Sequence, residues 1–161
     1  MTILEQKKNN AKVQALRLLT VRDRSVEELR ERLGRQFTED ETNQALEYLA
    51  GFGYLDDLRV AQNYVQYRNR QRPTGNYLLR IELRQKGIKD EYIEQVLNPP
   101  DIEYELALDL ATQRLRSLER FEKNVVARRL QSLLERRGFP GSLARRVVSE
   151  LLDRDPENEY N

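Results

Sequence analysis

A short pattern of residues recurs three times along this chain, and each copy starts 46 positions after the previous one. Each copy begins with an alanine, carries apolar residues three and four places later, and ends with an arginine at the seventh place. The three copies are Ala15–Arg22, Ala61–Arg68 and Ala107–Arg114. Similarity at a fixed period of about 20 to 50 residues is typical of stacked repeat arrays. Because such arrays present extended surfaces, the pattern favours a binding protein over an enzyme with an enclosed pocket.

Two further blocks follow in every copy and complete a unit of three helices. The first is a pair of leucines four residues apart, which a helix places on one face: Leu29 and Leu33, Leu79 and Leu83, and Leu130 and Leu134. The second is a pair of adjacent apolar residues: Ala45 and Leu46, Val96 and Leu97, and Val147 and Val148. The strict alternation of apolar and polar residues that is typical of strands is missing.

We therefore predict an all-α fold of three tandem three-helix repeats, with about nine helices in total. The predicted repeats cover residues 1–54, 55–99 and 100–161, and the third includes an acidic C-terminal tail.

Local signals place several helix ends. Ser25 with Glu28 and Thr38 with Glu41 have the spacing of capping boxes, in which the hydroxyl accepts a backbone N–H and the glutamate bonds back. We expect the helix that begins after Thr38 to end with Gly51 in the left-handed conformation.

The adjacent carboxylates Asp56 and Asp57 could be metal ligands or helix caps. We expect capping, because the two residues lie at the predicted start of a helix. We also expect Gly87 and Gly138 to end the second helices of their repeats.

The chain has no histidine and no cysteine. The usual general base, nucleophile and zinc ligands are therefore missing, and no glycine loop carries the Lys-Ser/Thr signature of phosphate binding. We predict that the protein is not an enzyme and uses no cofactor or metal. No run of about 18 apolar residues occurs, and Met1–Lys12 lacks the apolar centre of a secretory signal. We expect a cytoplasmic monomer that does not enter a membrane.

The net charge is only +1, but the charges are segregated along the chain. Residues 38–58 carry six acidic and no basic side chains, whereas residues 114–146 carry ten basic and three acidic ones. Two compatible interpretations are open: the acidic end of one repeat faces basic parts of the next, and stacking aligns the basic segments into a stripe. The low net charge disfavours a protein held to nucleic acid by bulk charge alone.

Several spaced motifs occur in the order that characterises one known family. They are the runs Gly53–Asp57 and Glu82–Ile88, the residues Arg59, Ala61, Tyr64, Arg68, Gly75 and Leu79 between them, the segment Arg22–Ser25 with Glu28 and Leu29, and the run Arg137–Phe139. On these residues the chain resembles the RecX family, bacterial regulators of the RecA recombinase. The likeness extends over about residues 11–152.

The resemblance implies an elongated, curved protein of tandem three-helix repeats. It also implies binding in the groove of RecA filaments on single-stranded DNA. Bound there, the protein would inhibit or modulate recombinase, ATPase and co-protease activities in DNA repair and the SOS response. One alternative is a DNA-binding module of helix-turn-helix-like units, which would bind naked DNA with a steep salt dependence. Another is a helical scaffold for an unrelated acidic partner.

Basic residues of the second repeat are the first candidates for contacting the filament or its DNA. Arginine suits carboxylate and phosphate because its fork bonds two oxygens at once, and Arg80 and Arg84 are one helical turn apart. The candidate set is Arg68, Arg70, Arg72, Tyr77, Arg80, Arg84 and Lys86. The alternative is that these are ordinary exposed helix positions, some of them paired with Glu82.

Basic residues of the third repeat form a second candidate set: Arg128, Arg129, Arg136 and Arg137, with Arg145 and Arg146 further along. Arg136 and Arg137 lie at a predicted helix C-terminus, where a positive charge also stabilises the helix dipole. Partner binding and a structural role are both open for this set.

Overall fold

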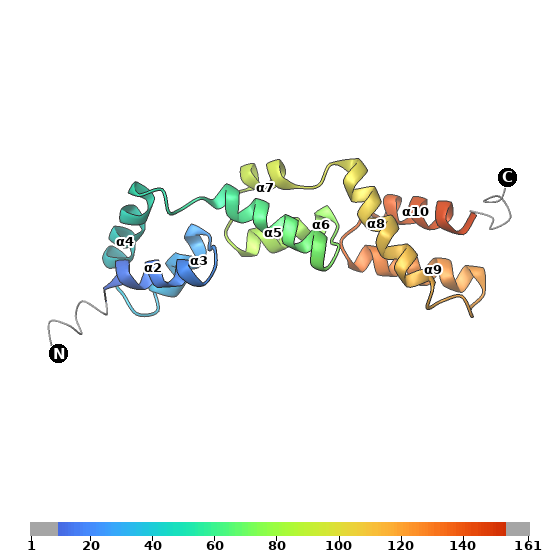
Figure 1. The fold of residues 1–161 in the computed structure, drawn as a ribbon, viewed down its shortest axis with the longest axis horizontal. Coiled ribbons are helices and arrows are strands. Elements are labelled where there is room, and N and C mark those ends of the chain that lie inside the picture. The colour runs from blue at the N-terminus through green and yellow to red at the C-terminus, as the bar shows by residue number, and fades with distance from the viewer. Residues whose placement is uncertain (1–9, 154–161) are drawn as a thin grey trace. The chain divides into compact units, whose positions relative to one another are not determined.

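The computed structural model describes residues 10–153, and every regular element in that range is an α-helix (Figure 1). The helices are α2 (Ala11–Val21), α3 (Val26–Leu33), α4 (Glu39–Gly51), α5 (Asp57–Gln71), α6 (Asn76–Gln85), α7 (Asp90–Val96), α8 (Pro100–Leu115), α9 (Lys123–Arg136) and α10 (Gly141–Asp153). The predicted all-α fold of tandem three-helix repeats is confirmed over these residues. Residues 154–161 of the predicted acidic tail lie outside the described range. None of the described helices is long and apolar enough to cross a membrane.

The residues that repeat in the sequence are the residues that fill the core. The three alanines that open the repeated pattern, Ala15, Ala61 and Ala107, have no exposed area. The six leucines spaced by four are also fully buried. Burial of one leucine side chain contributes about 1.5–3 kcal/mol, and the small alanines let neighbouring helices approach closely.

Two cores are assembled from the helices of the first and third repeats. In the first repeat α2, α3 and α4 pack around Leu29, Leu33 and Leu49. In the third, α8, α9 and α10 pack around Leu130 and Leu134. The chain divides into two compact units, residues 1–63 with 83–96 and residues 64–82 with 97–161.

The capping boxes are confirmed at both predicted positions, Ser25 with Glu28 and Thr38 with Glu41. The expected role of Gly51 is wrong, because α4 continues through this residue. The left-handed residue is Gly53, with φ of 71°.

The turn that ends α4 is closed by two backbone hydrogen bonds of 3.0 Å, from the Gly53 N–H to the Ala50 carbonyl and from the Tyr54 N–H to the Leu49 carbonyl. This is the bonding of a helix end whose left-handed residue follows the last helical turn. Gly87 and Gly138, with φ of 73° and 85°, end their helices as predicted.

The first and second repeats meet at the start of α3. The hydroxyl of Ser25 donates a hydrogen bond to the Lys86 carbonyl. The Asp57 carboxylate accepts one of 2.9 Å from the N–H of Val26, the first residue of that helix. Gly87 packs so closely here that a Cβ on it would lie 2.3 Å from a side-chain carbon of α3.

The second and third repeats meet in the same way at the start of α6. The Gly75 N–H donates to the Arg137 carbonyl at 2.8 Å, and the Asn76 N–H donates to the buried Glu103 carboxylate at 2.7 Å. A Cβ on Gly75 would lie 2.2 Å from the Gly138 carbonyl oxygen.

Both junctions therefore follow one arrangement. An acidic side chain from the first helix of the following repeat accepts the first N–H of the preceding repeat's second helix. The glycine turn that ends the following repeat's second helix packs against the same helix start. Because the first N–H groups of a helix have no partner within it, the next repeat supplies the missing acceptor.

We expect the substitution Gly75→Ala to destabilise the protein by about 1–3 kcal/mol, because the added methyl group meets a backbone oxygen that cannot move aside cheaply. The matched control is Gly51→Ala, where no atom lies within 4 Å of the added Cβ. We expect this helical control to be neutral or to stabilise by up to about 1 kcal/mol. Urea unfolding followed by circular dichroism measures both, and equal effects would contradict the close packing at Gly75.

Candidate partner-binding site

The outer face of α9 is rich in arginine. Val126, Leu130 and Leu134 are spaced by four and turn one face of this helix to the core. Arg128 and Arg129 lie on the remaining faces and are exposed. The core pattern therefore places a run of guanidinium groups on the surface of the third repeat.

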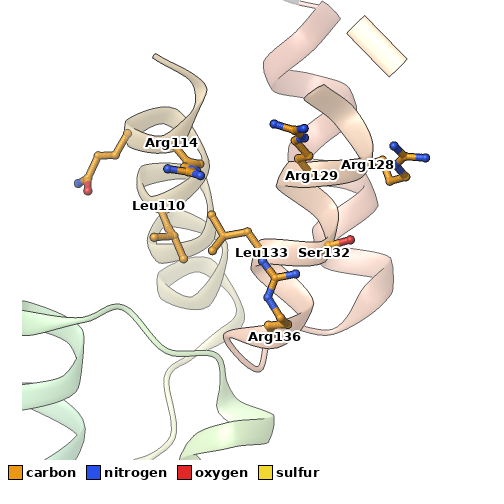
Figure 2. Close-up of a pocket in the computed structure, with 8 residues that line it drawn as sticks. Leu110, Arg114, Arg128, Arg129, Ser132, Leu133 and Arg136 are labelled. Carbon is orange, nitrogen blue, oxygen red and sulfur yellow. The ribbon is translucent and has the colours of Figure 1, made fainter. Parts of the chain in front are cut away.

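These arginines line a groove between α8 and α9 with a volume of about 690 Å³ (Figure 2). Its lining residues are Leu110, Gln113 and Arg114 of α8 and Arg128, Arg129, Ser132, Leu133 and Arg136 of α9. Figure 2 shows Leu133 pointing from α9 toward Leu110, with Arg129 and Arg136 above and below it. Among the residues that the structure describes, no carboxylate lines the groove. We call this surface the arginine groove.

One of these arginines is held by an aromatic ring. The guanidinium carbon of Arg129 lies 4.1 Å from the ring centroid of Phe121, in the connection between α8 and α9. A cation over an aromatic face contributes about 0.5–1 kcal/mol at an exposed site. This contact uses the ring face and leaves the N–H groups of Arg129 available to a partner.

Arg114 was missed as a site residue, although the sequence carries a signal for it. It is the arginine that closes the third copy of the repeated pattern, equivalent to Arg22 and Arg68. Arg22 pairs with Glu28 at 3.0 Å and Arg68 pairs with Glu82 at 2.8 Å, in each case with the second helix of the same repeat. Among residues 10–153, Arg114 and the three α9 arginines of the groove form no ion pair.

Several candidates of the second repeat are already engaged within the protein. Arg68 is only 18% exposed at its side chain because of its pair with Glu82. Arg84 pairs with Asp90 at 2.7 Å, with both side chains exposed. Lys86 lies 3.4 Å from the Glu28 carboxylate.

Two arginines of the third-repeat set are also engaged. Arg137 donates to the Pro73 carbonyl at 2.9 Å, and burial, with the nearby charges of Arg72 and Arg68, lowers its pKa. Arg146 pairs with Glu150 at 3.0 Å. Arg145 is exposed and lines a separate hollow beside α9. The structure thus separates Arg128, Arg129 and Arg136 from the rest of this set.

The remaining candidates are more accessible. The side chains of Arg70 and Arg72 are exposed, and Tyr77 is 66% exposed. Tyr77 and Arg80 line a hollow of about 540 Å³ that also contains the carboxylates of Glu103 and Glu135. The mixed charge of this hollow distinguishes it from the arginine groove.

A polar network at the centre of the second repeat explains why Arg68 is turned inward. The Tyr64 hydroxyl donates to Glu82 at 2.8 Å, and Arg68 donates to the other oxygen of the same carboxylate at 2.8 Å. Burial and the bond to Glu82 raise the pKa of Tyr64 from 10.0 to about 12. Arg68 and Tyr64 therefore act as structural residues here.

The carboxylates do not gather into a metal site within residues 10–153, where no cluster of three or more potential ligands occurs. Asp56 instead accepts the Arg59 N–H at 3.0 Å at the start of α5, which confirms the predicted cap. Asp57 instead accepts the Val26 N–H where the first and second repeats meet.

Comparisons with known proteins agree with this architecture. Models of the first, second and third three-helix domains of RecX match residues 11–49, 56–97 and 101–148. The Regulatory protein RecX of Prosthecochloris aestuarii is 36% identical over 141 residues, which cover 86% of this chain and 91% of that protein. The Regulatory protein RecX of Amycolatopsis mediterranei is 35% identical over 151 residues, 92% of this chain and 86% of that protein.

Solved structures show the same fold. The crystal structure of RecX from Lactobacillus salivarius matches with a TM-score of 0.79 at 20% identity, over 88% of this chain and 94% of that one. The domain matches, together with these relatives, define a regulatory protein built from tandem three-helix repeats. The chain belongs to the RecX family.

We expect Tyr64 of the folded protein to ionise with its pKa raised to about 12, in a titration followed by tyrosinate absorbance. Because the folded pKa is about 12 and the unfolded one near 10.0, the folded state keeps this proton while the unfolded state loses it. The protonated Tyr64 hydroxyl therefore makes its full contribution to the free energy of unfolding below pH 10, and this contribution falls as the pH rises toward 12. The substitution Tyr64→Phe should remove the late-ionising group, and an unchanged titration curve in that variant would refute the assignment.

Proposed function

We propose that this protein binds along RecA filaments on single-stranded DNA and restrains their recombinase, ATPase and co-protease activities. It would do so in the cytoplasm, as a monomer, during DNA repair and the SOS response. Membership of the RecX family supports a regulatory role. One structural observation supports direct binding: within residues 10–153, the arginine groove holds four guanidinium groups and no carboxylate.

The groove suits a partner that offers anionic oxygens beside apolar side chains. Hydrogen bonds to charged groups contribute about 1.5–3 kcal/mol each, and the arginine fork bonds carboxylate or phosphate with two donors. Leu110 and Leu133 add an apolar floor between the cations. This combination favours an acidic protein surface of the filament as the main contact.

The exposed residues Arg70, Arg72 and Tyr77, with the half-buried Arg80 that lines a hollow beside Tyr77, are a second proposed contact of the same filament. Arg68, Arg84, Lys86 and Arg137 would join only by exchanging their present partners. A curved array of repeats, as the family resemblance implies, would span neighbouring RecA protomers. Binding across protomers would oppose the movements that accompany ATP turnover.

Direct binding to DNA is the second candidate function, because guanidinium groups bind phosphate as well as carboxylate. The two functions differ in their response to salt. Binding to naked DNA releases counterions and weakens steeply as salt rises, whereas a protein surface that contacted Leu110 and Leu133 would bind in part through apolar contacts that salt does not weaken. Affinities for naked DNA, for the filament and for RecA alone at two salt concentrations separate them.

We expect the double substitution Arg128→Glu and Arg136→Glu to weaken co-sedimentation with RecA filaments by about tenfold or more, because two charge-assisted contacts become repulsive. Inhibition of the RecA ATPase should fall in parallel. Because both residues are exposed and form no ion pair among the described residues, unfolding stability should change by less than about 1 kcal/mol.

The control is a variant with the same change of charge in the first repeat, Arg17→Glu with Arg32→Glu, at exposed positions of α2 and α3. It should bind and inhibit like the unmodified protein. Equal loss in both variants would mean that overall charge, and not the arginine groove, determines binding. Full inhibition by the groove variant would exclude the groove as the contact.

A further inference from the structure

A hollow with a volume of about 790 Å³ lies within the first compact unit, where the first and second repeats meet. It is lined by residues of α3 and α4, of the connection to α5 and the start of that helix, and of α7 with the turn before it. Binding pockets for small ligands have volumes of about 300–1,000 Å³, so the size suits several side chains of a partner. Its apolar lining residues are Val26, Leu46, Ala50, Leu55, Leu58 and Tyr92. We call this surface the α4 hollow.

The contacts that join the two repeats also hold the sides of the α4 hollow together. The N–H of Val26 donates to the Asp57 carboxylate at 2.9 Å, and both residues line the hollow. Gly87, on the opposite side from Glu27, approaches it so closely that an added Cβ would lie 2.3 Å from the Glu27 Cβ. Because these contacts exist without a partner, the hollow is formed in advance, which reduces the cost of ordering on binding.

Negative charge is in excess among the lining residues. The charged lining consists of the carboxylates Glu27, Glu47, Asp56 and Asp57 and the cations Arg30 and Lys89. Glu27 pairs with Arg30 at 3.6 Å. Burial raises the pKa of Asp57, and the hydrogen bond from Val26 and the nearby charge of Lys89 oppose this shift. Within residues 10–153, Glu47 and Asp56 form no ion pair, so both carboxylates are open to a cation from outside.

We propose that the α4 hollow binds a basic amphipathic helix of a partner protein. Apolar side chains three or four residues apart on such a helix would bury against Leu46, Leu58 and Tyr92. Arginine or lysine side chains beside them would pair with Glu47 and Asp56. The inference goes beyond the proposed function, because it depends neither on the arginine groove nor on a RecA filament.

The lining of the hollow favours a helix of a protein over other occupants. The carboxylates of Glu47 and Asp56 repel the phosphates of nucleic acids and of anionic lipids. An extended peptide binds by adding to an open strand edge, and every regular element among residues 10–153 is a helix. Side chains of helices line the hollow, and a further helix packs by fitting its side chains into such a groove.

The test is fluorescence anisotropy of a labelled peptide titrated with the full chain. The peptide has about 18 residues, enough to form a helix, with leucines and arginines on one face and alanines elsewhere. We expect Glu47→Lys with Ala50→Lys to weaken binding by about tenfold or more, because lysines then face the arginines of the peptide. Both positions are exposed on α4, and circular dichroism checks that the variant is folded. Glu47→Gln alone should weaken binding about threefold, as the loss of one exposed ion pair.

The matched control is Asp40→Lys with Gln44→Lys. It makes the same total change of charge on the same helix, at exposed positions that do not line the hollow. In about 0.15 M salt, charges more than about 8 Å apart are largely screened. The control should therefore bind the peptide like the unmodified protein.

Three results would overturn the assignment. The first is equal peptide affinity in the hollow variant and in the control, which would reduce binding to overall charge. The second is the lack of saturable binding by the unmodified protein below about 1 mM peptide. The third is concentration-dependent dimerisation in sedimentation that Glu47→Lys with Ala50→Lys abolishes, which would make the occupant a second copy of this chain.

Discussion

The repeats are joined at the first N–H of the second helix in the first and second repeats, which finds its acceptor in the following repeat. Asp57 accepts from Val26 at one junction, and Glu103 accepts from Asn76 at the other. An unpaired N–H buried in these contacts would cost about 1–3 kcal/mol, so each repeat depends on the next. This dependence explains why the second repeat is divided between the two compact units, since each of its parts is bound to a different neighbour.

The arginine at the seventh place of the repeated pattern forms an ion pair in some repeats and not in others. The arginine that closes the repeated pattern is paired with a glutamate in the first two repeats, as Arg22 and Arg68. In the third repeat, Arg114 faces α9, whose one acidic residue, Glu135, does not line the groove. The absence of a carboxylate leaves this guanidinium group available and turns a structural residue into part of a candidate binding surface.

Sequence reasoning reached the core and the caps because local rules decide both. Leucines four residues apart share a helix face, and a Ser-x-x-Glu spacing brings the hydroxyl to the backbone N–H it accepts. The same reasoning failed where a shift of two residues changes the outcome, as with Gly51 and Gly53. It left open whether Arg68 contacts a partner or pairs with Glu82, because the local pattern does not show which side chains lie together.

The sequence by itself determined the helices, their grouping into threes and the family, because these follow from periodic apolar positions, caps and ordered motifs that need no distant contact. Only the tertiary structure decided which charged side chains pair within the protein and which are exposed to a partner. Pairing depends on the distance between side chains far apart in the sequence, such as Lys86 and Glu28, and packing of the helices alone sets that distance.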